Sequence, residues 1–398
     1  MNCVFILLLL LLALILSSIS HFQKKKFPFP TAREGLPFLG PLIAYRRNPR
    51  AFFARQRNKI GNCFFVDLIV LKFIFLGGPK GNEIQFKSPD TDLSLLEAMK
   101  QLFPSMFDTP PEFKDWSTKI NALVNSGINN QSSVDYWTEE MAPVINRHLS
   151  LWVQNSPILL FECLHSFIME VMITVIFGND VYLNHVSQFI LFFREYEAAI
   201  QTPVIMLLPY TWTSAGRAIL RLTKFISEIV TSESEKRIKN PDKYNERKDY
   251  LQHALNRTGT AYLADNVLVL HLIGLTIASI ANLNGVLGWT LLHAQASNST
   301  YKKLQSNPDN KTFIEACTRE TARLYSGLLV IRKSTKDISI PDWGVTIPKG
   351  YLTVRSPLEV HMREEIWGED AAEWKPERML DPNTFKKRLR SMEFVQFG

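Results

Sequence analysis

The chain has 398 residues, of which 46% are hydrophobic and 21% charged, so it can bury a large core and is not a disordered protein. Its net charge of +7 is a mild excess without a long basic stripe, and nucleic acid is therefore not an expected partner. The four cysteines are scattered and form no C-x-x-C pair, which argues against a disulfide scaffold or a structural zinc site.

The N-terminus carries thirteen consecutive apolar residues, Val4 to Leu16, and a triple lysine follows at 24–26. Positive charge after the run and none before it predicts a signal anchor, with the rest of the chain on the cytosolic side of a membrane. A cleaved signal peptide is the alternative, because the run is short for a full span and small serines follow it. We expect residues 1–22 to form a transmembrane segment.

The region after the anchor, residues 23–44, is basic and rich in proline and glycine, which predicts an extended hinge. Residues 62–76 are rich in β-branched and aromatic types and are predicted to form strands. From about 91 to 330 the pattern is mostly helical, and short strands return after 335. The charged stretch 232–250 is expected to be a solvated connection. The expected fold is mainly α with small β-sheets, an α+β domain covering residues 45–398.

One long segment, Asn266 to Tyr301, contains no Asp, Glu, Lys or Arg. It can be a second transmembrane helix or the buried central helix of a large protein. We favour the buried helix, because a membrane span should not bring two asparagines to its midplane without a functional reason.

Several common catalytic motifs are missing from the sequence. H-E-x-x-H, G-x-G-x-x-G, G-x-x-x-x-G-K-[ST] and G-x-S-x-G do not occur, so a zinc hydrolase, a nucleotide-binding protein and an α/β-hydrolase are unsupported. No clustered set of histidine and cysteine ligands predicts a metal site.

A candidate charge cluster remains in the C-terminal third. Glu320 and Arg323 lie three residues apart in a helical run and can form an ion pair on one face. Arg378 follows in a Trp-Lys-Pro-Glu-Arg sequence and can supply a second guanidinium. On a surface such a pair contributes little, whereas a buried carboxylate between two guanidinium groups would form a rigid clamp.

The order of the motifs on either side of this charge cluster indicates a protein family. The series resembles the C-terminal half of the cytochrome P-450 (heme-thiolate monooxygenase) family, and the anchor, hinge and early strands follow the same layout. The resemblance covers essentially the whole chain. Its motifs are Glu320…Arg323, Arg332, Ile347-Pro348-Lys349-Gly350, His361, Glu365-Ile366-Trp367-Gly368, Trp374-Lys375-Pro376-Glu377-Arg378 and Phe394-Val395-Gln396-Phe397-Gly398.

The resemblance implies a heme cofactor and assigns roles to residues around it. Glu320, Arg323 and Arg378 would form the structural triad behind the heme, and Arg332 would face a heme propionate. From spacing alone, a solvated turn at Arg332 is the simpler interpretation. The family also implies a lipophilic substrate, electrons from an NADPH-dependent reductase, and a single-pass location in the endoplasmic reticulum membrane with the catalytic domain facing the cytosol.

The charge-free segment resembles the family's central helix but departs from its usual A-G-x-D-T-T. Ala278, Ala281 and Asn282 are the candidate catalytic positions, with Ala281 replacing the acid and Asn282 the threonine. This variant is similar to the steroid 7α-hydroxylase and prostacyclin synthase branch, which implies a sterol- or terpenoid-like substrate. An amide can orient a water but cannot supply a proton. Asparagines satisfied inside the core are the alternative.

The last motif, Phe394 to Gly398, matches the opening of the family's F-x-x-G-x-x-x-C-x-G loop. The axial cysteine is therefore expected beyond Gly398, and a chain without it is expected to be inactive. Two further hypotheses stay open. One is a non-catalytic truncated paralogue that binds an apolar ligand, and the other is a multi-span membrane protein built on Val4–Ile19 and Val267–Leu292.

Overall fold

The computed structural model describes residues 29–35, 39–68, 71–102, 116–128, 130–155, 157–200, 212–258, 267–325 and 329–395. The predicted anchor at 1–22 lies outside these residues. The described residues fall into two compact units. Those within 1–98 and 307–398 form the first unit, and those within 99–306 form the second.

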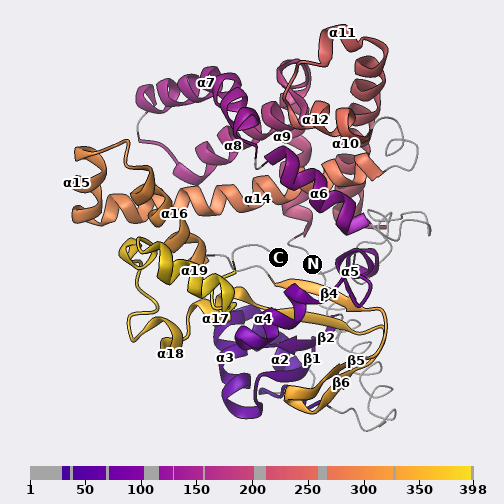
Figure 1. Cartoon of the computed structure of the whole chain (residues 1–398), viewed down its shortest axis with the longest axis vertical. Helices are drawn as coiled ribbons and strands as arrows, with labels where there is room; N and C mark the ends of the chain where they lie inside the picture. The colour runs from indigo at the N-terminus through magenta and orange to yellow at the C-terminus, as the bar shows by residue number, and fades with distance from the viewer. Residues whose placement is uncertain are drawn as a thin grey trace, which may run out of the picture. The chain divides into compact units, whose positions relative to one another are not determined.

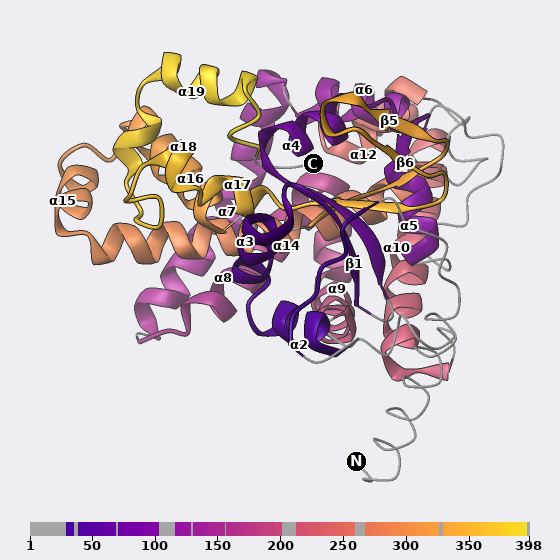
Figure 2. The same ribbon diagram turned by 90° about the horizontal axis from the view of Figure 1, so that it is seen from below.

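The first unit is built on a five-stranded sheet with the strand order β1-β2-β7-β4-β3. Figure 2 shows indigo strands from the N-terminal part of the chain beside orange strands from the C-terminal part. Its β1 and β2 confirm the strands predicted at 62–76. β2 pairs in parallel with β7, and the other neighbours are antiparallel. The strands are β1 Cys63–Asp67, β2 Lys72–Leu76, β3 Leu93–Ser94, β4 Val330–Ser334 and β7 Leu352–Arg355.

A two-stranded sheet, β5 Ile338–Ile340 and β6 Val345–Ile347, completes the strands of this unit. The turn between them contains the short 3-10 helix η3, Pro341–Trp343, and ends at Gly344, whose φ of 62° suits glycine. Both sheets bury side chains in one apolar cluster, made of Phe29, Ile74, Leu76, Ile340 and Ile347.

The helices of the first unit include one that begins inside the predicted hinge, and α2, α3 and α4 contact the larger sheet. Helix α2 starts at Leu39, so the extended hinge does not reach residue 44. Pro41 is tolerated because the first turn of a helix needs no backbone N–H donor. The helices are α2 Leu39–Arg47, α3 Pro49–Ile60, α4 Gly78–Lys87, α16 Lys311–Tyr325, α17 Pro357–His361, α18 Glu364–Trp367, η4 Pro376–Met379 and α19 Pro382–Arg390, while α5 Leu95–Leu102 crosses the boundary between units.

The second unit is helical throughout its described residues, as the pattern predicted. Its charge-free helix α14 packs along α8 and α10 (Figure 1). By length and composition α8 and α14 could each cross a membrane, yet both contribute to the apolar core of this unit, which favours the buried-helix interpretation. The helices are α6 Trp116–Ile128, α7 Gln131–Gln154, α8 Leu160–Phe177, α9 Asn179–Ile200, α10 Ser214–Lys239, α11 Pro241–Tyr244, α12 Tyr250–Thr258, α14 Val267–Ala296 and α15 Asn298–Ser306.

The expectation of a solvated connection at 232–250 is wrong. Helix α10 continues to Lys239, and Arg237 is fully buried. Its guanidinium donates to Asp249 Oδ1 at 2.6 Å and to the carbonyl oxygen of Phe177 at 2.6 Å. The prediction failed because Arg237 forms an ion pair with Asp249, twelve residues further along the chain. Paired in this way, both charged groups can be buried.

Candidate functional site

The pair predicted on α16, Glu320 and Arg323, is completely buried in the first unit. Arg323 Nε donates to Glu320 Oε2 at 2.8 Å, and Arg323 Nη2 donates to Glu320 Oε1 at 2.7 Å. This is the two-point geometry in which a guanidinium binds a carboxylate most strongly. The i, i+3 spacing places both side chains on one face of the helix.

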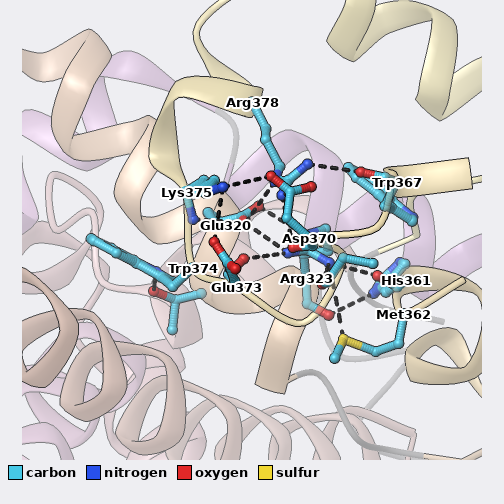
Figure 3. Close-up of polar contacts among 12 residues, drawn as sticks. Glu320, Arg323, His361, Met362, Trp367, Asp370, Glu373, Trp374, Lys375 and Arg378 are labelled. Carbon is cyan, nitrogen blue, oxygen red and sulfur yellow. Dashed lines mark hydrogen bonds and ion pairs between the residues drawn. The ribbon is translucent and has the colours of Figure 1, made fainter. Parts of the chain in front are cut away.

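The same arginine fastens α16 to the segment that follows the larger sheet (Figure 3). Arg323 Nη1 donates to the carbonyl oxygens of His361 at 2.6 Å and Ala371 at 2.7 Å, and Nη2 donates to that of Glu373 at 3.0 Å. Its guanidinium also lies 4.9 Å from the centre of the Trp367 ring. All five N–H donors of the guanidinium are thus used, two on the Glu320 carboxylate and three on backbone carbonyls of residues 361–373.

Arg378, in η4, reaches Glu320 less directly than the sequence suggested. Its Nε lies 3.5 Å from Glu320 Oε1 without forming a hydrogen bond. Its other nitrogens donate to the carbonyl oxygens of Trp367 and Asp370, both at 2.8 Å, and Nη2 also forms an ion pair with the Asp370 carboxylate. Glu320 accepts instead from the backbone N–H of Lys375 at 3.0 Å. In the clamp, Arg323 therefore binds Glu320 in a bidentate manner, whereas Arg378 mainly binds the backbone of Trp367 and Asp370 (Figure 3).

His361 connects this clamp to the last described residues. Its Nδ1 contacts the carbonyl oxygen of Arg323 at 3.1 Å, and the backbone N–H of Val395 donates to its Nε2 at 3.1 Å. The acceptor role of Nε2 leaves the proton on Nδ1, which donates to Arg323. Full burial lowers the pKa of His361 to about 3, so the imidazole is neutral. The ring also stacks on Phe394 at 5.1 Å.

Arg332 lies in β4 and not in a turn, so the simpler interpretation from spacing is wrong. It is half-buried, and Nη1 donates to the carbonyl oxygen of Leu93 at 3.2 Å. Burial lowers the pKa of its guanidinium. Its strand position fixes the side chain on one face of the sheet, where a charged ligand group could be bound.

Ala278, Ala281 and Asn282 lie in the second unit, on α14. The two alanines are exposed and Asn282 is half-buried. Asn282 Nδ2 donates to the carbonyl oxygen of Ala278 at 2.8 Å, which leaves its Oδ1 as the group able to accept from water. By contrast, His271 on the same helix is buried and bonded to Tyr250, with 2.8 Å between Nε2 and the hydroxyl, and is tied into the core.

One face of α14 has room for a flat group. Gly274 and Gly285 lie on the same helical face as Ala278 and Ala281, and a Cβ added at either glycine would meet no atom within 4 Å. In the first unit, Arg332 can bind a carboxylate. Heme is a flat apolar macrocycle that carries carboxylates. The open face of α14 by itself fits the macrocycle, and Arg332 by itself fits a carboxylate.

Burial affects two of the described cysteines, whereas Cys163 in α8 is half-buried. Burial raises the pKa of Cys63 to about 12, and Cys317 is buried in α16 on the helix of the clamp. Among the residues that the structure describes, no three His, Cys, Asp or Glu side chains gather as ligands for a metal ion.

Sequence reasoning missed three residues of the clamp: His361 as a neutral link, Trp367 beneath Arg323, and Asp370 as the partner of Arg378. The only available signal was the sequence order of His361 and Trp367 within the motif series. Their contacts join segments that are far apart in the chain, and no periodicity reports such contacts.

Comparison with known proteins now identifies the class of protein. The family model described as "Cytochrome P450" matches residues 30–398, so the chain belongs to the cytochrome P450 family and by that resemblance is a monooxygenase. "Cytochrome P450 monooxygenase pyvB" of Aspergillus violaceofuscus is 25% identical over 93% of this chain and 77% of its own length. "Eburicol 14-alpha-demethylase" of Penicillium italicum is 20% identical over 93% and 78%.

A solved structure shows the same fold. The structure described as "Retinoic acid bound cyanobacterial CYP120A1" superimposes with a TM-score of 0.68 at 19% identity, covering 90% of this chain and 84% of that one. The P450 fold, mostly helical with small sheets, is therefore established from sequence family and from structure independently.

The clamp predicts a graded loss of stability. Arg323→Ala would leave Glu320 buried without its bidentate partner and should lower the free energy of unfolding by about 3–5 kcal/mol. Arg378→Ala should cost less, because Glu320 keeps both hydrogen bonds from Arg323. Arg319→Ala on the same helix, whose partner Glu315 is exposed, is the control and should cost up to about 1 kcal/mol. Denaturant unfolding measures all three, and equal losses for Arg323 and Arg319 would contradict a buried clamp.

Neutral His361 predicts a dependence of stability on pH. Its pKa is about 3 when folded and about 6.5 when unfolded, so only the unfolded state gains a proton as the pH falls through this window. Stability should therefore fall from pH 6.5 towards pH 3. Between pH 6.5 and pH 5 the free energy of unfolding should fall by about 2 kcal/mol less in His361→Gln than in the parent. Chemical denaturation at both pH values measures this difference. The same loss in both proteins would show that His361 does not carry this effect.

Proposed function

We propose that the protein is a membrane-anchored, heme-dependent monooxygenase that acts on a lipophilic, sterol- or terpenoid-like substrate. The observation that carries the proposal is the P450 fold together with the buried Glu320–Arg323 clamp. The sterol demethylases among its relatives and the departure from the usual central-helix motif at Ala281 and Asn282 support the substrate class.

Heme, when bound, supplies the activation of dioxygen from which one oxygen atom enters the substrate. Arg332 would bind a carboxylate of the heme. The small side chains on one face of α14 would leave space for an apolar substrate. Asn282 holds a water through its Oδ1 while Nδ2 stays on the carbonyl of Ala278. Its amide orients the proton-carrying water and does not itself supply the proton.

The Glu320–Arg323 clamp fixes the position of the last described residues, which precede the loop expected to carry the heme ligand. Arg323 holds the carbonyl of His361, and His361 accepts from the backbone of Val395. We infer from the Phe394…Gly398 motif that the axial cysteine follows Gly398 and that an NADPH-dependent reductase supplies the electrons.

Heme binding is tested spectroscopically on two proteins. The 398-residue chain should bind added hemin without a thiolate-type Soret band after reduction and carbon monoxide, because none of its four cysteines stands at the cysteine position of the F-x-x-G-x-x-x-C-x-G motif. A chain extended through the cysteine loop of its own gene should show that band. A thiolate spectrum from the shorter chain would contradict the assignment of the ligand. An extended chain without the band would favour a non-catalytic protein that binds an apolar ligand.

The membrane anchor is tested by fractionation. Carbonate-washed microsomes should retain the full chain, and deletion of residues 1–23 should release most of it, because the apolar run is then lost. Location on the cytosolic side predicts that the four N-glycosylation sequons stay unmodified. A glycosylated chain would place the catalytic domain in the lumen and refute the proposed topology.

A further inference from the structure

Arg355, at the end of β7, is buried without a charged partner. Its side chain is 1% exposed, Nη1 makes a long 3.4 Å hydrogen bond to Asn82 Oδ1, and Nε has no partner. Across the described ranges no carboxylate forms an ion pair with it. Burying a guanidinium in this way costs several kcal/mol unless an anion is close.

The other deeply buried arginines show how this chain usually stabilises a buried guanidinium. Arg237, Arg323 and Arg355 are the arginines among its largest fully buried side chains. Arg323 binds Glu320 through two hydrogen bonds, and Arg237 binds Asp249 at 2.6 Å. Arg355 alone of these lacks a carboxylate among the described residues. It is thus the one whose partner is expected to come from a ligand.

A second guanidinium lies beside Arg355. In the pairing of β4 with β7, Arg332 faces Thr353 and Val330 faces Arg355, so both arginines lie on the same face of the sheet and are diagonal neighbours. Burial and then the charge of Arg332 lower the pKa of Arg355 to about 10. Two like charges held together in a poorly hydrated place repel each other, and an anion between them removes that repulsion.

The polar side chains around Arg355 position it and do not neutralise it. Asn82 on α4 contacts its Nη1 and anchors itself by donating to the carbonyl of Met392 at 2.9 Å. Gln85 on the same helix donates to Thr353 Oγ1 at 2.9 Å. These neighbours of Arg355 are uncharged amides and a hydroxyl, so its positive charge remains available to a ligand. Asp90 acts on Arg332, the other member of the pair.

We propose that Arg355 and Arg332 form a single carboxylate-binding site and that its ligand is a heme propionate. The inference rests on the proposed heme cofactor and adds to it a residue that no motif predicted. Two guanidinium groups can together bind a carboxylate through several charge-assisted hydrogen bonds. The carboxylate of an acidic apolar substrate has the same chemistry, and the experiment separates the two sources.

The test titrates the protein with hemin and with hemin dimethyl ester, which lacks free carboxylates. The parent should bind hemin more tightly than the ester. Arg355→Met should bind hemin at least tenfold more weakly and the ester unchanged, so that its preference disappears. Without ligand, Arg355→Met should melt at the same temperature as the parent or higher, because an unpaired buried charge is removed. Arg355→Lys keeps the charge without the planar fork and should bind hemin with intermediate affinity.

Arg363→Met is the matched control, because Arg363 binds Glu359 through Nε at 2.9 Å and Nη2 at 2.6 Å. It should lower the melting temperature without ligand and keep the preference for hemin over the ester. Arg355→Met would overturn the proposal if its hemin affinity were unchanged, or if its binding of hemin and of the ester were weakened equally. If Arg355→Met instead bound palmitate more weakly and hemin as the parent does, the site would belong to a substrate. A parent that binds neither porphyrin would overturn the proposed function itself.

Discussion

The first unit depends on one buried ion pair, Glu320 with Arg323. A carboxylate without exposure to water is stable only if its charge is met at close range, and the bidentate arginine meets it. The same arginine uses its remaining hydrogen-bonding capacity on backbone carbonyls from 361 to 373. The ion pair therefore does more than neutralise a charge, because it fixes the course of an irregular segment that has little secondary structure of its own.

Burial divides the ionisable groups of this unit into those that keep their charge and those that lose it. His361 has no carboxylate beside it and is neutral, so it can donate from one nitrogen and accept at the other. Arg323 has the Glu320 carboxylate as its bidentate partner. Arg355 is also fully buried but has another arginine, Arg332, as its diagonal neighbour. The contrast between these two arginines separates a structural charge from one positioned for a ligand.

Helix α14 suits apolar ligands because it has no charged side chains and few bulky ones on one face. Its side chains carry no charge, its inner face packs on α8 and α10, and small residues leave another face open. Asn282 turns its donor back to the helix and keeps an acceptor free. A helix with this composition suits apolar ligands, and the amide limits its own role in proton delivery to orienting water.

The sequence by itself determined the family, the helical character of 91–330, the strands at 62–76 and the pairing of Glu320 with Arg323, because these depend on local periodicity and on motif order. Only the tertiary structure decided the long contact between Arg378 and Glu320, the helix that begins at Leu39, the buried Arg237–Asp249 pair and the neutral link at His361. Arg355 belongs to the second group. Its burial and its missing partner follow from which strands become neighbours, and strand neighbours distant in sequence leave no trace in local composition.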